Sequence, residues 1–215
     1  MADFRKNVLL VEGKKDRLVI PYLMEANGVN WGTKQYPAVY IRDYDGYSQL
    51  INPIEISTAL KASGLVALGL MLDADSNPLA RWQNVRAACL KSIPDIPEEL
   101  PDSGLIHETQ AGIRFGIWMM PDNKMRGMLE TFLAYMIPDE SESLWQYAQE
   151  VVTPAKDKGA PFKDIHVDKA HIHTWLAWQD PPGEQLHTAV MAKVLNPQHP
   201  KAQIFVNWFR NLYNL

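Results

Sequence analysis

The sequence predicts an α/β fold with a mostly parallel β-sheet flanked by helices, followed by a helical layer at the C-terminus. In the first half of the chain, short apolar runs alternate with segments of helical periodicity, which is typical of βαβ units. These runs are continuously apolar, which indicates strands that are buried on both faces. From residue 141 onward only helical patterns follow, and prolines separate them.

The first half of the chain contains three predicted strands and two predicted helices. The strands lie at residues 8–11, 38–42 and 65–72. The first helix keeps its apolar residues at helical spacing over 18–26, and Pro21 within it predicts a kink or a late start. The second helix begins at Pro78, and Ser76 or Asn77 is its expected cap, because a short polar side chain can accept a bond from a free N–H of the first turn.

The second half is predicted to add a short pair of strands and then only helices. The strands lie at 104–106 and 113–120, and an amphipathic helix follows over 128–136. Further helices are expected at 141–152, 165–179, 184–195 and 201–213. We therefore expect an α/β domain at 1–137 and a helical C-terminal extension at 138–215 that packs on it.

The composition excludes several classes of protein. With 215 residues, of which 47% are apolar and 21% charged, the chain can bury a sizeable core. Its longest apolar stretch, at 65–72, is far shorter than the roughly 20 residues that cross a bilayer. No apolar region of the signal-peptide type follows Arg5 and Lys6. We therefore expect a cytoplasmic protein without a membrane span.

The cysteine count and the net charge narrow the range of partners. Cys89, the single cysteine, cannot form an intramolecular disulfide or a cysteine-rich zinc site, and it agrees with a reducing compartment. The formal net charge of −4 has the wrong sign for a protein that holds nucleic acid by bulk electrostatics. Any contact with DNA or RNA is therefore expected to be local or assisted by a metal.

Acidic residues end two of the predicted strands. Glu12 closes the first strand, Asp16 follows one helical turn later, and Asp73 and Asp75 close the third strand. In an open parallel sheet the functional crevice lies beyond the carboxyl ends of the strands, so these four side chains are expected to converge there. Unpaired carboxylates repel one another, and bound divalent cations, basic partners or raised pKa values relieve the repulsion. Oxygen ligands favour Mg²⁺ or Mn²⁺ over zinc.

Two stretches carry a resemblance to a known fold. VLLVEGKKD at 8–16 and LGLMLDADSN at 68–77 resemble the acidic motifs of the Toprim fold. Toprim is the metal-binding catalytic domain of topoisomerases, bacterial primases, recombination-mediator proteins and overcoming-lysogenization-defect (OLD) nucleases. The resemblance covers roughly residues 5–135. GIWMMPDN at 116–123, GMLETFL at 127–133 and KAHIHTWLAWQ at 169–179 are similar to a small Toprim-related family that is only distantly like the OLD nucleases.

The resemblance implies roles for the acidic residues. Glu12 becomes the candidate general acid or base, Asp73 and Asp75 the metal ligands, and Asp16 the support of a second metal. One or two Mg²⁺ ions would activate water and stabilise the charge that develops on a phosphate. Gly13, directly after Glu12, is expected to let the backbone turn sharply and to let a phosphate approach.

Weaker candidates have an ordinary structural explanation as well. They are Lys14 beside the site, Asp122 at the end of the last predicted strand, Glu130 in the helix after it, and Lys169 in the helical extension. Lys14 and Lys169 could neutralise a phosphate or could be surface lysines. Asp122 could lie near the metal or could belong to an ordinary turn with Asn123, which is the favoured interpretation. Glu130 could reach a second metal or could be a solvated glutamate near a helix N-terminus.

The histidines and tryptophans of the extension have a structural explanation. His171 and His173 lie two apart on a predicted helix, so their side chains diverge by about 200° and cannot share a metal. Trp175 and Trp178 share a helical face and could stack on bases, but a role in the core is favoured.

Three functions remain open from the sequence. The first is a Mg²⁺-dependent phosphodiesterase, such as a nuclease or a protein that processes nucleic acid. The second is phosphoryl or nucleotidyl transfer on a small phosphorylated substrate. The third is a non-catalytic Toprim-like module that acts with a partner protein, since fold alone is weak grounds for function. Carboxylates that surround an open crevice would favour catalysis, whereas carboxylates that point apart or pair with buried arginines would count against it.

Overall fold

A computed structural model describes residues 5–215, so residues 1–4 of the predicted α/β domain lie outside the described residues. It contains a five-stranded sheet in the order β2-β1-β3-β5-β4. The strands are β1 (Asn7–Val11), β2 (Tyr40–Asp43), β3 (Ala67–Asp73), β4 (Leu105–Glu108) and β5 (Arg114–Met120). All neighbours are parallel except β4, which pairs antiparallel with β5 at one edge. The predicted mostly parallel α/β sheet is confirmed.

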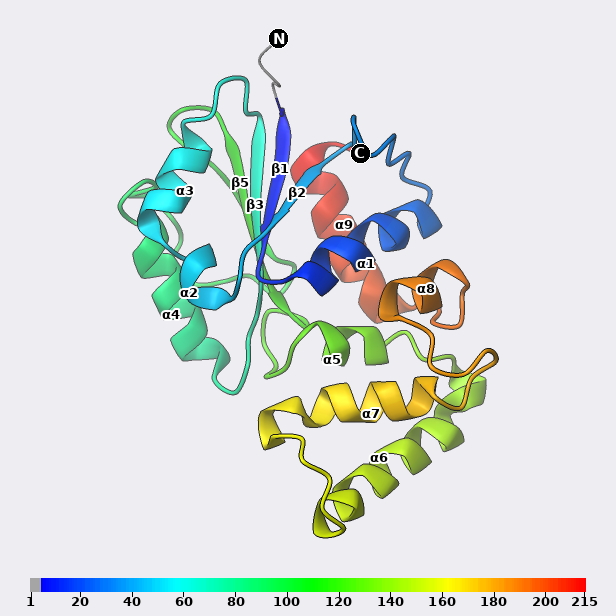
Figure 1. Cartoon of the computed structure of the whole chain (residues 1–215). Helices are drawn as coiled ribbons and strands as arrows, with labels where there is room; N and C mark the ends of the chain where they lie inside the picture. Colours follow the sequence, from blue (N-terminus) through cyan, green and yellow to red (C-terminus); the bar gives the residue numbers. More distant parts are fainter. Residues whose placement is uncertain (1–4) are drawn as a thin grey trace.

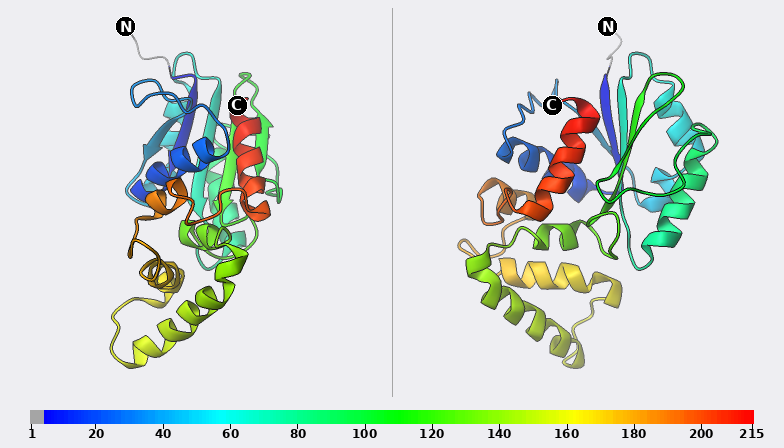
Figure 2. Two further views of the ribbon diagram at one scale, coloured as in Figure 1. Left: turned by 90° about the vertical axis from the view of Figure 1, so that its right-hand side faces the viewer. Right: turned by 180° about the vertical axis from the view of Figure 1, so that it is seen from behind.

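Helices cover both faces of this sheet (Figures 1 and 2). Along β1, Leu9 and Val11 belong to one buried cluster, while Leu10 belongs to the other. The first cluster is completed by α1 (Lys14–Ala26), α5 (Leu129–Ala134), α7 (Val167–Leu176), α8 (Leu186–Met191) and α9 (Pro200–Tyr213). The second is completed by α2 (Tyr47–Leu50), α3 (Pro53–Leu60) and α4 (Pro78–Cys89). Burial on both faces explains why the strands read as continuous apolar runs.

Several helices differ from the sequence expectation. The first begins at Lys14 and continues through Pro21, so the late start is wrong. The helices α2 and α3 were not predicted, although Asn52 caps α3 and Pro53 occupies its first turn. At α4 the prediction holds, because the Asn77 side chain accepts a bond from the backbone N–H of Ala80, and Pro78 begins the helix.

The C-terminal helix α9 packs directly on the sheet at two glycines. Gly69 on β3 and Gly116 on β5 are neighbours in the strand register, so together they leave a shallow strip on that face. A Cβ atom added to Gly69 would lie 2.4 Å from the hydroxyl oxygen of Tyr213, and one added to Gly116 would lie 2.5 Å from Leu212. The Tyr213 hydroxyl donates to the Val8 carbonyl oxygen at 2.9 Å, which ties α9 to β1.

The helices α6 and α7 lie below the sheet, beyond the carboxyl ends of its parallel strands (Figure 1). The long helix α6 (Glu142–Asp157) packs against α7, and α7 packs against α5. Single 3₁₀ turns, Asp139–Ser141 and Asp164–His166, precede α6 and α7. Among the helices of residues 5–215, none is both long enough and apolar enough to cross a membrane. The α5–α7 contact brings the helical part of the chain to the edge where the acidic strand ends lie.

Candidate functional site

An open crevice of about 620 Å³ lies beyond the carboxyl ends of β1, β2 and β3. Its walls come from five parts of the chain: residues 12–16 after β1, residues 43–46 at the end of β2, Asp73 at the end of β3, Leu129 and Glu130 from α5, and Lys169 from α7. The strand ends therefore meet where the topology predicts, and a helix from the C-terminal part closes one side.

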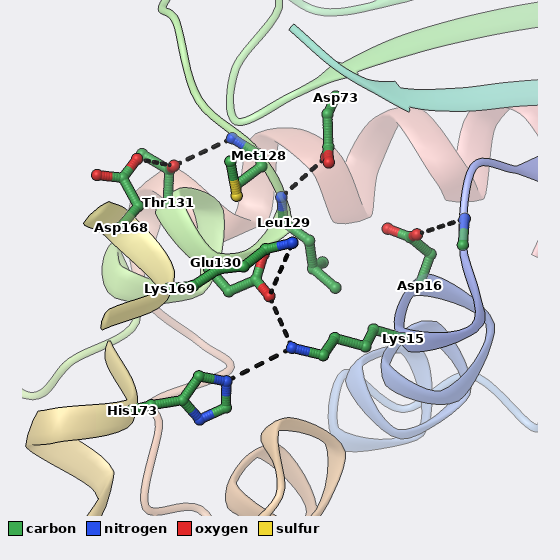
Figure 3. A network of polar contacts seen from close by, with 11 residues as sticks. Lys15, Asp16, Asp73, Met128, Leu129, Glu130, Thr131, Asp168, Lys169 and His173 are labelled. Carbon is green, nitrogen blue, oxygen red and sulfur yellow. Dashed lines mark hydrogen bonds and ion pairs between the residues drawn. The ribbon is translucent and has the colours of Figure 1, made fainter. Parts of the chain in front are cut away.

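Backbone hydrogen bonds hold the carboxylates of Glu12 and Asp73. The backbone N–H of Asp73 donates to Oε2 of Glu12 at 3.3 Å, which joins the ends of β1 and β3. Oδ1 of Asp73 in turn accepts from the backbone N–H of Leu129 at 3.0 Å, at the start of α5 (Figure 3). Both side chains are thus fixed by the main chain and not by a basic partner.

Asp16 is held in the same way at the start of α1. Its Oδ2 accepts from the backbone N–H of Gly13 at 3.0 Å (Figure 3). Gly13 has an extended backbone with φ −143°, and a Cβ atom there would make an ordinary contact of 3.4 Å with Asp16. The chain does bend at Glu12 and Gly13, between β1 and α1, but the extended conformation of Gly13 is open to any residue, so the bend does not require glycine. Its N–H is also already engaged by Asp16.

The acidic residues repel one another in a nearly buried setting. Burial, together with the charges of Glu12 and Glu130, raises the pKa of Asp16 to about 7, although the hydrogen bond from the Gly13 N–H opposes the shift. Burial also raises the pKa of Asp73, together with repulsion from Asp16, Glu12 and Glu130. Near neutral pH the cluster therefore retains protons, and a cation that displaced them would relieve the repulsion.

Glu130 is the most deeply buried carboxylate, with its side chain 2% exposed. Its Oε1 pairs with Nζ of Lys15 at 3.0 Å and lies 4.0 Å from Nζ of Lys169 (Figure 3). The expectation of a solvated glutamate is wrong, because α5 turns this residue inward against α1 and α7. Lys169 lines the crevice as well and is only partly exposed.

His173 joins this network, although no sequence pattern indicated a place for it there. Its Nε2 lies 3.5 Å from Nζ of Lys15. Burial, and then the positive charge of Lys15, lower the pKa of His173. The divergence predicted for the two histidines agrees with their places, since His171 packs edge-on against Trp145 in the helical part. Lys15 and His173 are 158 residues apart in sequence, so only the tertiary fold brings them together.

A chain of hydrogen bonds fixes α7 to the start of α5. The Thr131 hydroxyl donates to the Asp168 carboxylate, and the same hydroxyl oxygen accepts from the backbone N–H of Met128 at 3.0 Å (Figure 3). Since Asp168 immediately precedes Lys169, this link sets where the lysine stands relative to Glu130.

Comparison with known proteins identifies the family. The model of a family described as "Protein of unknown function (DUF3226)" matches residues 6–214. The chain belongs to the DUF3226 family. No curated protein matches it. Two solved structures of the C-terminal region of the OLD protein of Xanthomonas campestris pv. campestris are similar to it, at 16% and 13% identity, with TM-scores of 0.47 and 0.45. Each comparison covers 99% of this chain, and 98% and 97% of the other.

One predicted metal ligand of this DUF3226 protein lies outside the crevice. Asp75 has a left-handed backbone with φ 51°, and its N–H and C=O both bond to Gly127 at 2.9 Å. Its carboxylate pairs with Arg81, whose side chain is only 12% exposed and whose guanidinium stands 3.6 Å from the centre of the Tyr47 ring. The turn to positive φ ends the strand geometry after Asp73. Asp73 and Asp75 therefore do not share a direction.

Asp122 likewise has a structural role. Its carboxylate accepts from the backbone N–H groups of Lys124 and Met125 and from the Tyr135 hydroxyl. Asn123 has φ 67°, and its side-chain oxygen accepts from Met119 at 2.8 Å. These bonds form the turn that the Pro-Asp-Asn sequence favours. Lys14, by contrast, does line the crevice of the DUF3226 protein.

The crevice fits a divalent cation in chemistry but is not preassembled for one. Glu12, Asp16 and Asp73 offer carboxylate oxygens, which are the ligands that Mg²⁺ and Mn²⁺ prefer. Burial and mutual repulsion raise the pKa of the two aspartates, so a bound cation would stabilise their charged forms. Within residues 5–215, no three carboxylate, imidazole or thiol side chains stand close enough to hold a metal as they are placed. Binding would require side-chain rotation toward a common point.

Proposed function

We propose that this DUF3226 protein is a metal-dependent phosphodiesterase with a Toprim-like acidic centre that acts on nucleic acid. The observation that carries the proposal is the pairing of opposite charges in one open crevice. Three carboxylates that repel one another, the buried Asp16 and the partly buried Glu12 and Asp73, face the same space as three lysines, Lys14, Lys15 and Lys169. Such a site offers oxygen ligands to a cation and positive charge to a phosphate.

The residues that would hold Mg²⁺ or Mn²⁺ are Glu12, Asp16 and Asp73. Bound there, the ion would polarise a phosphate and lower the pKa of a water molecule. Asp75 is left out of the proposed set because its carboxylate is paired with Arg81. Glu130 is better suited to holding Lys15 and Lys169 in place than to binding the metal, since both lysines approach the same oxygen.

Glu12 is the proposed general acid or base. One of its oxygens is fixed by the Asp73 backbone N–H, which orients the carboxylate at the crevice. A general base must lie within hydrogen-bond reach of the proton that it takes, so a fixed orientation helps. We propose that Lys14, Lys15 and Lys169 neutralise the charge of the phosphodiester. Because the chain has a net charge of −4, it can offer positive charge to a phosphate only locally.

The volume of the crevice also supports a second candidate function, a reaction on a small phosphorylated substrate. About 620 Å³ lies in the range of sites for small molecules, so a small phosphorylated substrate could occupy the same place. The acidic centre and the lysines would serve both reactions. The choice of substrates in the assay separates the two.

The test is metal-dependent cleavage by the purified chain. We would incubate it with Mn²⁺ or Mg²⁺ and with circular, linear and single-stranded DNA and RNA, and would compare Glu12→Gln and Asp73→Asn with the wild type. Both substitutions keep the size of the side chain and are expected to lower the rate by at least about 100-fold. Chelation is expected to abolish cleavage, and Asp75→Asn to retain it.

Glu99→Gln serves as the matched control, because it removes an exposed carboxylate from a loop outside the crevice. Cleavage that survives Glu12→Gln and Asp73→Asn would identify a contaminant and overturn the proposal. Absence of cleavage on every nucleic acid, with hydrolysis of a small phosphodiester such as bis-p-nitrophenyl phosphate, would favour the small-substrate function. Absence of both activities and of metal binding by calorimetry would favour a non-catalytic module.

A further inference from the structure

A second hollow, of about 490 Å³, lies at the opposite end of β1 from the acidic crevice. Its walls come from residues 5–7 at the start of β1, from residues 34–38 between α1 and β2, and from Tyr40. Among the described residues that line it, three are basic and none is acidic. In Figure 1 the segment between α1 and β2 lies at the end of the sheet where β1 begins, away from α5. We call this hollow the basic patch.

A tight turn presents Tyr36 at the edge of the basic patch. Thr33 and Tyr36 exchange two backbone hydrogen bonds of 3.2 and 3.0 Å, and the Thr33 hydroxyl accepts a further bond from the Tyr36 N–H. Gly32 pairs with Pro37 across the turn and has φ +84°, and a Cβ atom there would lie 2.4 Å from the Tyr36 carbonyl oxygen. The turn is thus fixed by its own backbone, while the Tyr36 residue is 70% exposed.

The positive charges beside Tyr36 are Arg5, Lys6 and Lys34. The guanidinium of Arg5 stands 3.3 Å from the centre of the Tyr40 ring, which orients it at the wall of the patch. Lys6 and Lys34 are exposed. In a chain with more acidic than basic residues, the two exposed lysines at this hollow form a local positive surface of the kind that contact with a polyanion requires.

We propose that the basic patch binds a single-stranded segment of nucleic acid. Lys6 and Lys34 contact phosphates, and the exposed ring of Tyr36 stacks on a base. Proteins that bind single strands combine these same two elements, cationic side chains along the backbone and aromatic faces for the bases. A duplex hides its base faces, and an acidic peptide has no ring to stack on Tyr36, so the pairing of charge with an exposed aromatic favours the single strand.

This site is separate from the proposed reaction. Glu12 follows Lys6 by six positions, with β1 between them, which corresponds to about 20 Å of extended chain at roughly 3.3 Å per residue. A strand held at the basic patch therefore need not enter the acidic crevice, and its binding requires no metal. The proposal stands whether or not the chain cleaves nucleic acid.

The test is fluorescence anisotropy of a fluorescein-labelled 12-nucleotide oligothymidylate with the full chain in EDTA. The chelator excludes metal-assisted binding in the crevice. Tyr36→Ala is expected to weaken binding at least about fivefold, and Tyr36→Phe to retain it, because stacking uses the ring and not the hydroxyl. Lys6→Ala and Lys34→Ala are each expected to lower the slope of log affinity against log salt by about 0.7.

Matched controls remove equivalent groups elsewhere. Lys61→Ala takes an exposed positive charge from the end of α3, and Tyr147→Ala takes an exposed ring from α6. Both are expected to bind like the wild type, and thermal unfolding of each variant checks that it is folded. The proposal fails if no saturable binding is seen, if Tyr36→Ala and Tyr36→Phe behave alike, or if the lysine variants keep the wild-type slope.

Two further probes exclude other partners. A 12-base-pair duplex is expected to bind more weakly than the single strand, and equal affinity would overturn the stacking argument. Vesicles of phosphatidylglycerol test an anionic lipid surface, and binding to them that depends on Tyr36, in the absence of oligonucleotide binding, would assign the patch to a membrane instead. Loss of cleavage in Glu12→Gln without loss of oligonucleotide binding would separate this site from the proposed activity.

Discussion

The acidic crevice and the α9 interface use the same sheet in opposite ways. At the α9 interface, Gly69 and Gly116 make room for Leu212 and Tyr213, apolar side chains surround them, and the Tyr213 hydroxyl is hydrogen-bonded. At the carboxyl ends of β1 and β3, Asp16 and Asp73 are nearly buried beside other carboxylates, so their charged forms are disfavoured. The comparison indicates that the α9 interface raises the free energy of unfolding and that the acidic crevice lowers it, as is common at functional sites.

The largest expected effect lies at the α9 interface. Gly69→Ala places a Cβ atom 2.4 Å from the Tyr213 hydroxyl and 2.8 Å from Leu9, so α9 must move or Tyr213 must break its bond to Val8. We expect a loss of about 3 kcal/mol in the free energy of unfolding, measured by urea denaturation. Gly13→Ala, which meets only an ordinary contact, serves as the control and is expected to cost less than about 1 kcal/mol. Equal losses in the two variants would contradict the close approach of α9.

The next effect has the opposite sign and lies in the crevice. Asp16 has a folded-state pKa of about 7, above its ordinary value of 3.8, so between these values the folded state binds more protons than the unfolded state. The stability of the wild type is therefore expected to fall as pH rises from about 4 to 7. Asp16→Asn removes this charge, and its amide oxygen can still accept from Gly13. We expect it to stabilise the protein at pH 8 by on the order of 2 kcal/mol.

Urea denaturation at several pH values checks this expectation. The gain of Asp16→Asn should shrink toward pH 4, where the wild-type carboxyl is protonated in the folded state and partly protonated in the unfolded state. A gain that does not vary with pH would mean that the charge of Asp16 is not the cause. If the crevice binds Mg²⁺, the ion should raise the melting temperature of the wild type more than that of Asp16→Asn, because the variant lacks one ligand charge.

The smallest effect sharpens the comparison at α9. Tyr213→Phe removes one buried hydrogen bond, to the Val8 carbonyl oxygen, and is expected to cost about 1 kcal/mol in the free energy of unfolding. It also removes the atom that Gly69→Ala would approach. The two substitutions together should therefore cost less than the sum of the single losses. Strict additivity in urea denaturation would show that the hydroxyl is not the obstacle.

The strands could be predicted because burial on both faces leaves a continuous apolar signal. Once the strands were predicted, the proximity of Glu12 and Asp73 could be predicted as well, since parallel strands bring their carboxyl ends to one edge of the sheet. Asp75 could not be placed, because its positive φ interrupts the strand geometry after Asp73. The short helices α2 and α3 had a signal in Asn52-Pro53 that the apolar pattern alone does not show.

The rest of the site depends on contacts that no local pattern encodes. Glu130 meets Lys15 across 115 residues of sequence, and His173 meets Lys15 across 158. These contacts depend on where the fold places α1, α5 and α7, of which α5 and α7 pack against each other. Gly69 and Gly116 were weak sequence evidence for the position of α9, because a glycine inside a strand often marks the close approach of another backbone or element.

The strip formed by Gly69 and Gly116 has a consequence for the order in which the chain can fold. The sheet consists of residues 7–120, yet the helix that fills its glycine strip, α9, comes from residues 200–213. During synthesis, one face of the sheet therefore stays partly uncovered until the ribosome has translated about eighty further residues. For several seconds at ordinary elongation rates, the growing chain would expose apolar strands that are prone to aggregation. Chaperone binding to the nascent chain would be strongest in that interval.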